Sequence, residues 1–220
     1  MRAQYLVLVI LLLLFSGCRA ILLKKMVNQY DNRTGEQFAP IIAEDTAGLK
    51  TTVEAYQDKI LYVDFWATWC APCINMIPHH DTLVQLLESD TSIIFVNICV
   101  DKNENKARWR EIIHQKDYKG RNLFLDIADP QTKSLRLDES GFPFYLLVGK
   151  GGVVLGCDLS PDEKIWVPYA LLQAKDGKTV KASLKNFFKQ AKRMHHHDDA
   201  ETKAFVDFLD KYIIKKNAAE

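Results

Sequence analysis

The chain has 220 residues, of which 48% are hydrophobic and 26% charged, and its formal net charge at pH 7 is +1. This balance excludes a disordered chain and a strongly basic protein that would bind nucleic acid, and the length suits one packed domain of roughly 150–200 residues. Five cysteines are too few for a scaffold built from disulfides, so each cysteine needs its own explanation.

The N-terminus predicts a secretory signal. One basic residue precedes an apolar run that ends at Phe15, and this run is shorter than the roughly 20 apolar residues of a membrane-spanning helix. The sequence FSGC at residues 15–18 resembles a bacterial lipobox. The resemblance implies that residues 1–17 are removed and that Cys18 carries a lipid. An uncleaved anchor and a signal cleaved without lipid attachment are the alternatives, and each of them places the remaining chain outside the cytoplasm.

A polar segment follows the signal. Residues 18–37 contain the turn formers Asn32 and Gly35, and we expect them to act as a tether. Beyond the tether, the run ILYVDFW at residues 60–66 predicts a strand with one acid, Asp64, in its middle.

The next element is a predicted helix over residues 73–88, where apolar residues recur at helical spacing. Pro78 lies inside it and should kink it. His79 and His80 follow this proline, and we expect both on the surface.

The remaining elements alternate between strand and helix. We predict a buried strand at 92–100, a helix at 104–115, a strand at 122–127, a short helix from Pro130, a hairpin of strands 144–148 and 153–156, and helices at 179–193 and 201–216. Strands that alternate with helices and end in a hairpin predict an α/β fold, with a central mixed sheet flanked by helices.

Two cysteines lie where the first strong strand meets its helix. Cys70 and Cys73 are separated by Ala71 and Pro72, and this spacing allows a disulfide within one helical turn. A sulfur at a helix N-terminus meets unpaired N–H groups, which lower its pKa and favour the thiolate. We therefore predict Cys70 as the attacking thiol and Cys73 as the resolving thiol.

Asp64 is the third candidate catalytic residue. A carboxyl group within an apolar strand is costly to bury, and burial should raise its pKa. Such a group could take the proton of Cys73 and return it. The alternative is that Asp64 ends the strand or points to solvent.

The other cysteines and the histidines are interpreted as structural. Cys99 and Cys157 are expected as small buried side chains, with a second disulfide between them left open. A zinc site at the CxxC pair lacks further ligands at the usual spacing. The run His195–His197 is expected in an exposed loop, with metal binding left open, and Asp199 is placed to cap the last helix.

The motif VDFWATWCAPC at residues 63–73 resembles the active-site strand and turn of the thioredoxin superfamily, and Pro78 falls where that family's helix kinks. GFPF at residues 141–144 resembles the family's cis-proline element. The resemblance implies a thioredoxin fold with no cofactor or metal beyond the redox-active Cys70–Cys73 disulfide. It also implies a substrate-binding surface, which consists of Trp69, Ala71, Pro72, Phe142 and Pro143.

The long separation between the CxxC motif and the proline resembles the membrane-tethered TlpA/ResA-like branch, with residues 104–127 as its extra helix and strand. Residues 38–158 are then the thioredoxin-like domain, and residues 159–220 a helical C-terminal extension packed on it. The resemblance implies an envelope thiol-disulfide oxidoreductase facing the periplasm, which reduces protein disulfides and takes electrons from a membrane donor. The Ala-Pro pair between the cysteines fits a reducing protein.

Two other functions remain as alternatives. A thiol peroxidase of this superfamily would have a threonine three residues before its reactive cysteine, whereas Thr68 lies two residues before Cys70. A non-catalytic or metal-delivery binding module would keep the fold, but copper-delivery relatives have a three-residue gap between their cysteines.

Overall fold

The computed structural model describes residues 25, 27–54, 58–194 and 199–214. Cys18 and the run His195–His197 lie outside these residues. The described chain is built on a seven-stranded sheet with the order β2-β1-β5-β4-β3-β6-β7. The strands are β1 (Ile41–Asp45), β2 (Lys50–Val53), β3 (Ile60–Trp66), β4 (Ile93–Asp101), β5 (Arg121–Asp126), β6 (Phe144–Val148) and β7 (Val154–Cys157).

The sheet is mixed, as predicted. Strand β4 pairs in parallel with both β3 and β5, whereas β6, β7, β1 and β2 join through antiparallel pairs. The two cysteines follow the C-terminal end of β3, which lies between β4 and β6 in the sheet.

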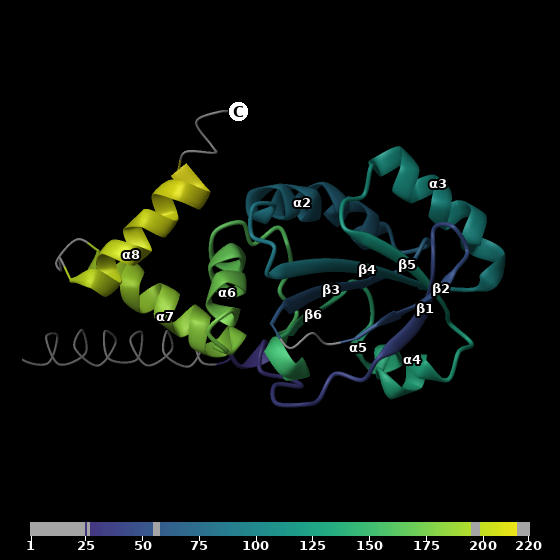
Figure 1. Cartoon of the computed structure of the whole chain (residues 1–220), viewed down its shortest axis with the longest axis horizontal. Coiled ribbons are helices and arrows are strands. Elements are labelled where there is room, and N and C mark those ends of the chain that lie inside the picture. Colours follow the sequence, from purple (N-terminus) through teal and green to yellow (C-terminus); the bar gives the residue numbers. More distant parts are fainter. Residues whose placement is uncertain (1–24, 26, 55–57, 195–198, 215–220) are drawn as a thin grey trace, which may run out of the picture.

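Helices cover both faces of this sheet, with α2 and α3 over one face and α4 and α5 below the other (Figure 1). The helices are α2 (Ala71–Leu87), α3 (Lys106–Lys116), α4 (Gln131–Ser134), α5 (Leu137–Ser140), α6 (Trp166–Ala174), α7 (Val180–Arg193) and α8 (Ala200–Leu209). Short 3₁₀ turns at Asn103–Asn105 and Lys150–Gly152 and a π-helical turn at Asp210–Ile214 complete the described elements. The thioredoxin fold expected from the sequence is confirmed.

Strand β3 divides the core into two faces. Every residue of β3 is buried, and successive side chains of a strand point to opposite faces. Tyr62 and Trp66 pack on the α2 face, whereas Val63 and Phe65 pack on the other. Asp64 shares the parity of Tyr62 and Trp66, so its carboxyl group is directed at α2.

The segment before β1 packs more closely than a tether. Val27 and Tyr30 are buried, and the Tyr30 ring lies 4.9 Å from the Trp166 ring. Cys157 N donates a hydrogen bond to Tyr30 O at 3.2 Å. The second half of the expected tether at 18–37 therefore differs from a free linker, because its apolar side chains bind the domain.

The C-terminal helices bury their apolar faces against one another and the sheet. Tyr169 of α6 lies at the centre of an aromatic group, with ring centroids 5.5 Å from Phe187, 5.6 Å from Phe205 and 5.1 Å from Phe208. The last helix thus packs on α6 and α7, which project from one end of the sheet (Figure 1). In the described part of the chain, no helix combines the length and apolar character that crossing a membrane requires.

Candidate active site

The two cysteines of the CxxC motif form a disulfide at the start of α2. Their Cα atoms are 5.3 Å apart. Cys70 is the N-cap of α2, and its Sγ accepts a hydrogen bond from Cys73 N at 3.2 Å. The helix therefore begins at Ala71, earlier than the predicted Cys73. A thiolate at Cys70 would meet the positive end of the helix dipole, which favours its charged form.

A buried carboxylate that the sequence analysis overlooked holds the loop before these cysteines. Asp101, the last residue of β4, accepts hydrogen bonds from Thr68 N at 3.1 Å and Thr68 Oγ1 at 2.6 Å. Burial alone would raise the pKa of Asp101, but hydrogen bonds from Thr68 and Asn105 outweigh it and lower that pKa. No local sequence signal could have identified this contact, because it depends on the parallel pairing of Trp66 with Cys99, which brings the residues two positions later side by side.

The surface around the disulfide is apolar and accessible. Trp69 is 60% exposed, and its ring lies 5.9 Å from the Phe142 ring in an edge-to-face arrangement. The peptide bond between Phe142 and Pro143 is cis, and Ala71 and Pro72 are exposed. The structure thus brings Trp69 and Phe142, two of the predicted substrate-binding residues, into one surface.

A groove opens beside these two rings. It has a volume of about 400 Å³. Its lining is mostly apolar and consists of Trp69, Val100, Ile127, Thr132, Lys133, Leu137, Gly141 and Phe142. An extended polypeptide lying across the disulfide would find room there for a side chain.

Asp64 is buried below the CxxC loop, with 2% of its surface exposed. Tyr118 Oη donates a hydrogen bond to Asp64 Oδ2 at 2.5 Å, and Asp64 Oδ1 has no hydrogen-bond partner among the described residues. Burial raises the pKa of the Asp64 carboxyl to about 6, against the opposing effects of His80 and the Tyr118 hydrogen bond. The carboxyl therefore exchanges its proton near neutral pH.

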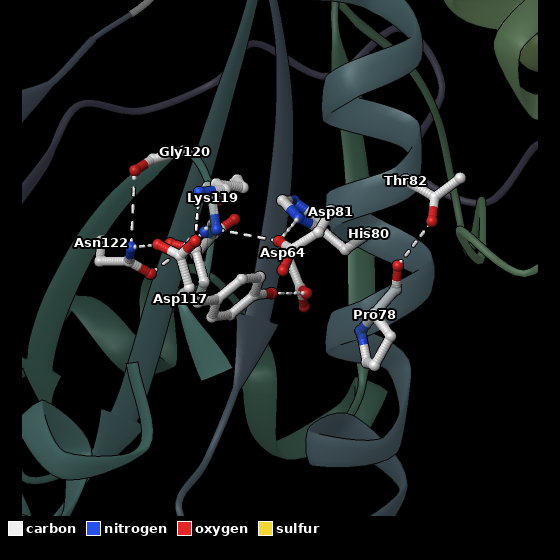
Figure 2. Close-up of polar contacts among 11 residues, drawn as sticks. Asp64, Pro78, His80, Asp81, Thr82, Asp117, Lys119, Gly120 and Asn122 are labelled. Carbon is white, nitrogen blue, oxygen red and sulfur yellow. Dashed lines mark hydrogen bonds and ion pairs between the residues drawn. The ribbon is translucent and has the colours of Figure 1, made fainter. Parts of the chain in front are cut away.

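His80 is fully buried, so the expectation that it lies on the surface was wrong. The reason is its phase on α2, where it falls on the inward face together with Cys73 and Ile77. Figure 2 shows His80 and Asp81 on α2 close to Asp64. His79, by contrast, is partly exposed.

Cys99 and Cys157 are buried and free, so the second disulfide that the sequence left open is absent from the described residues. Burial raises the pKa of both thiols, that of Cys157 to about 12 with a contribution from Asp158. Within the described ranges, no group of three or more His, Cys, Asp or Glu side chains could hold a metal ion. Asp199 caps α8 as predicted, accepting from Thr202 N at 3.0 Å.

Comparisons with known proteins agree with this geometry. Residues 41–114 match the thioredoxin family model. The thiol-disulfide oxidoreductase ResA of Bacillus cereus is 25% identical over 151 residues, which are 67% of this chain and 83% of that protein. ResA of Halalkalibacterium halodurans is 33% identical over 66 residues, and this match covers 30% of this chain and only 38% of that protein.

Two solved structures share the fold at low sequence identity. A thiol:disulfide interchange protein from Bacteroides sp. superposes with a TM-score of 0.50 and 20% identity, covering 74% of this chain and 95% of its own. A thiol-disulfide oxidoreductase from Bacteroides fragilis gives a TM-score of 0.50 at 16% identity, covering 56% and 90%. The sheet order, the helix-capping CxxC disulfide and the family match together lead to one conclusion: the chain has a thioredoxin fold, and residues 41–114 within it match the thioredoxin family.

Proposed function

We propose that this protein is a thiol-disulfide oxidoreductase that reduces disulfides of proteins in the bacterial envelope. The observation that carries the proposal is the Cys70–Cys73 disulfide at the N-terminus of α2. The ResA relatives support it, because both are named thiol-disulfide oxidoreductases.

The reaction starts from the reduced dithiol. The Cys70 thiolate attacks one sulfur of a substrate disulfide, so that a mixed disulfide forms and one substrate thiolate leaves. Cys73 then loses its proton and attacks Cys70 Sγ, which releases the second substrate thiolate and closes the Cys70–Cys73 disulfide. Two electrons pass to the substrate, and a dithiol donor must return them before the next cycle.

Asp64 is proposed as the acceptor of the Cys73 proton. Its carboxyl group is directed at α2, the helix that carries Cys73, and its pKa of about 6 allows both charge states near neutral pH. One carboxyl oxygen has no hydrogen-bond partner in the described structure and could take the proton.

The substrate is proposed to be an extended protein segment. Trp69, Phe142 and Pro143 supply an apolar surface beside the disulfide, and Ala71 and Pro72 are exposed next to it. In the thioredoxin superfamily, which the GFPF element resembles, the backbone of the residue before this proline pairs with the substrate, and here that residue is Phe142.

Membrane tethering belongs to the same proposal. The apolar run ending at Phe15 and the lipobox-like sequence before Cys18 support a lipid anchor that leaves the domain facing the periplasm, with electrons supplied by a membrane donor. Cys18→Ala should move the protein from the membrane fraction to the soluble fraction without changing its redox activity.

Insulin reduction with dithiothreitol as the electron source tests the enzymatic proposal. Wild type should accelerate the precipitation of reduced insulin, and Cys70→Ser should abolish this acceleration. Cys99→Ala is the matched control, because Cys99 is a buried free thiol outside the motif. Equal activity of Cys70→Ser and wild type would exclude catalysis by this pair.

The direction of electron flow is decided by the redox potential. Titration of the Cys70–Cys73 pair against glutathione should give a value near the roughly −270 mV of thioredoxin, whereas a value near −120 mV would indicate an oxidase. Mixed disulfides trapped by Cys73→Ala in cells would identify the substrates.

A further inference from the structure

His80 is an unusual side chain for the interior of α2. It is 0% exposed, and neither of its ring nitrogens has a hydrogen-bond partner among the described residues. A buried polar group without a hydrogen-bond partner destabilises the folded state, and an apolar side chain at this position would avoid that cost. The other buried residues of α2 are Cys73, Ile77, Leu83 and Leu87. Packing alone therefore does not explain an imidazole at this position.

The ring is packed against the group that holds Asp64. Its centroid lies 4.9 Å from that of Tyr118, whose hydroxyl group binds Asp64 Oδ2. His80 also acts on the charge of Asp64, because it favours the ionised carboxyl. Cys73 and His80 share the inward face of α2 two turns apart, about 10 Å along the helix.

The ring also lies near a carboxylate that is partly exposed to water. His80 Nδ1 lies 3.6 Å from Asp81 Oδ1, and the Asp81 side chain is 14% exposed. Asp81 is held in place by Lys119 N, which donates to Oδ1 at 2.9 Å. Figure 2 shows Asp64, His80, Asp81 and Lys119 together between the sheet and α2.

The proposed reaction needs a route for a proton at this place. Asp64 is buried, and a bound substrate covers the disulfide surface above it while Cys73 gives up its proton. A second path, leading away from the substrate, would let the carboxyl release that proton to water.

We propose that His80 relays protons between the buried Asp64 and Asp81 at the surface, two helical turns away from the disulfide. The inference rests on the proposed function. Neither ring nitrogen is hydrogen-bonded to Asp64, so in this proposal one of them takes the proton of the Asp64 carboxylic acid through a bridging water. The other ring nitrogen gives its own proton to Asp81, which passes it to water. The imidazole carries the same charge before and after, so the net result is the movement of one proton and no electron. His80 acts through Asp64 and is a positioning residue for its proton.

Side chains from the sheet and from the segment before β5 surround His80. Tyr62 of β3 and Phe95 of β4 contact the His80 ring. Tyr118, in the segment before β5, contacts the same ring and donates its hydroxyl hydrogen bond to Asp64 of β3. Tyr145 of β6 stacks on Tyr62. Lys119 offers only its backbone N–H here, because its amine pairs with Asp117.

Chemical rescue separates a relay from a packing role. In His80→Ala, the rate at which Cys73 resolves a mixed disulfide should fall on the order of tenfold, a modest share of what proton transfer contributes to catalysis. Imidazole in the buffer should restore the rate, whereas pyrazole, which has the same size but is not basic at neutral pH, should not. Equal rescue by both compounds would overturn the relay, because filling the cavity would then be sufficient.

A second variant distinguishes loss of the proton relay from loss of folding. His80→Phe fills the site with an apolar ring and should be at least as stable as wild type toward urea, yet resolve the mixed disulfide as slowly as His80→Ala. His79→Ala is the matched control on the same helix and should keep the wild-type rate. Wild-type resolution by His80→Phe would reject the relay while leaving the oxidoreductase intact, whereas an inactive wild-type protein would reject the proposed function itself.

Discussion

The carboxyl of Asp64 is an acid that the fold holds out of water. Its pKa is raised from 3.8 to about 6 by burial, so the folded protein binds this proton more tightly than the unfolded chain does. Stability must therefore fall as the pH rises from about 4 to about 6, and the full penalty remains above that range. A shift of about two units corresponds to about 3 kcal/mol.

Asp64→Asn should remove this penalty. The amide oxygen can still accept from Tyr118, so the free energy of unfolding should rise by about 3 kcal/mol at pH 8 and by little at pH 4. Urea unfolding of the oxidised protein at the two pH values measures this difference. Asp58→Asn on the exposed surface is the control, and an equal gain from Asp64→Asn at both pH values would contradict the explanation.

The four described cysteines should differ in reactivity. After reduction, iodoacetamide should modify Cys70 at the helix N-terminus within minutes, whereas Cys99 and Cys157 should remain unmodified until the protein is unfolded. Burial raises the pKa of the Cys99 and Cys157 thiols, so neither of these two ionises near neutral pH. Peptide mapping by mass spectrometry checks this, and early labelling of Cys99 would disprove it.

At the level of elements, the CxxC loop is joined to β4 as well as to its own strand and helix. Thr68 donates two hydrogen bonds to Asp101, so the loop before Cys70 is fixed on one side by a buried charge. Hydrogen bonds to charged groups contribute more to the free energy of unfolding than hydrogen bonds between neutral groups do. Their loss also leaves buried donors without partners.

Asp101→Ala should therefore lower the free energy of unfolding by roughly 2–3 kcal/mol and shift the redox potential of the Cys70–Cys73 pair. Asp101→Asn keeps one acceptor oxygen and should lose less on both measures. Urea unfolding and glutathione titration provide the two readouts. An unchanged potential in Asp101→Ala would show that Asp101 supports the fold without positioning the cysteines.

The elements that the sequence predicted well are those with a clear pattern. Ile60–Trp66 and Phe144–Val148 have the predicted bounds because each is a continuous apolar run. Helix α6 was missed because nearly all its residues are buried, so it shows no alternation of apolar and polar positions, and Pro168 lies inside it. Strand β1 was missed because Ile42 is half exposed and two acids end the strand.

Prediction from sequence meets the same limit at the candidate site. The CxxC pair and the cis-proline follow a known local pattern, and the buried Asp64 followed from its apolar neighbours. The contacts of Asp101 and His80 depend on elements that are distant in sequence, namely the strand pairing of β3 with β4 and the packing of α2 on Tyr118. No local pattern specifies such contacts.

At the scale of the whole molecule, one glycine joins the N-terminal segment, the sheet and the C-terminal helices. Gly156 of β7 has φ of +153°, and a Cβ atom there would lie 2.5 Å from Val180 Cγ2 and 2.6 Å from Tyr30 O. These neighbours belong to α7 and to the segment before β1.

Gly156→Ala should push these neighbours apart and destabilise the protein by about 1–3 kcal/mol, as overpacking usually does. Thermal unfolding measures the loss. Gly177→Ala is the control, because that glycine also has positive φ but no atom within 4 Å of the added Cβ. A similar loss in both variants would show that backbone strain alone is responsible.

The same arrangement sets the direction in which the redox centre faces. Tyr30 and Val27 pack with α6, α7 and the first residues of β3, whereas Cys70 follows the last residue of that strand, roughly 20 Å further along. A protein held by its N-terminus would carry its disulfide on the outward side, turned away from the lipid. Soluble clients could then dock freely, while a donor embedded in the bilayer would have to extend its own dithiol by about the thickness of this domain.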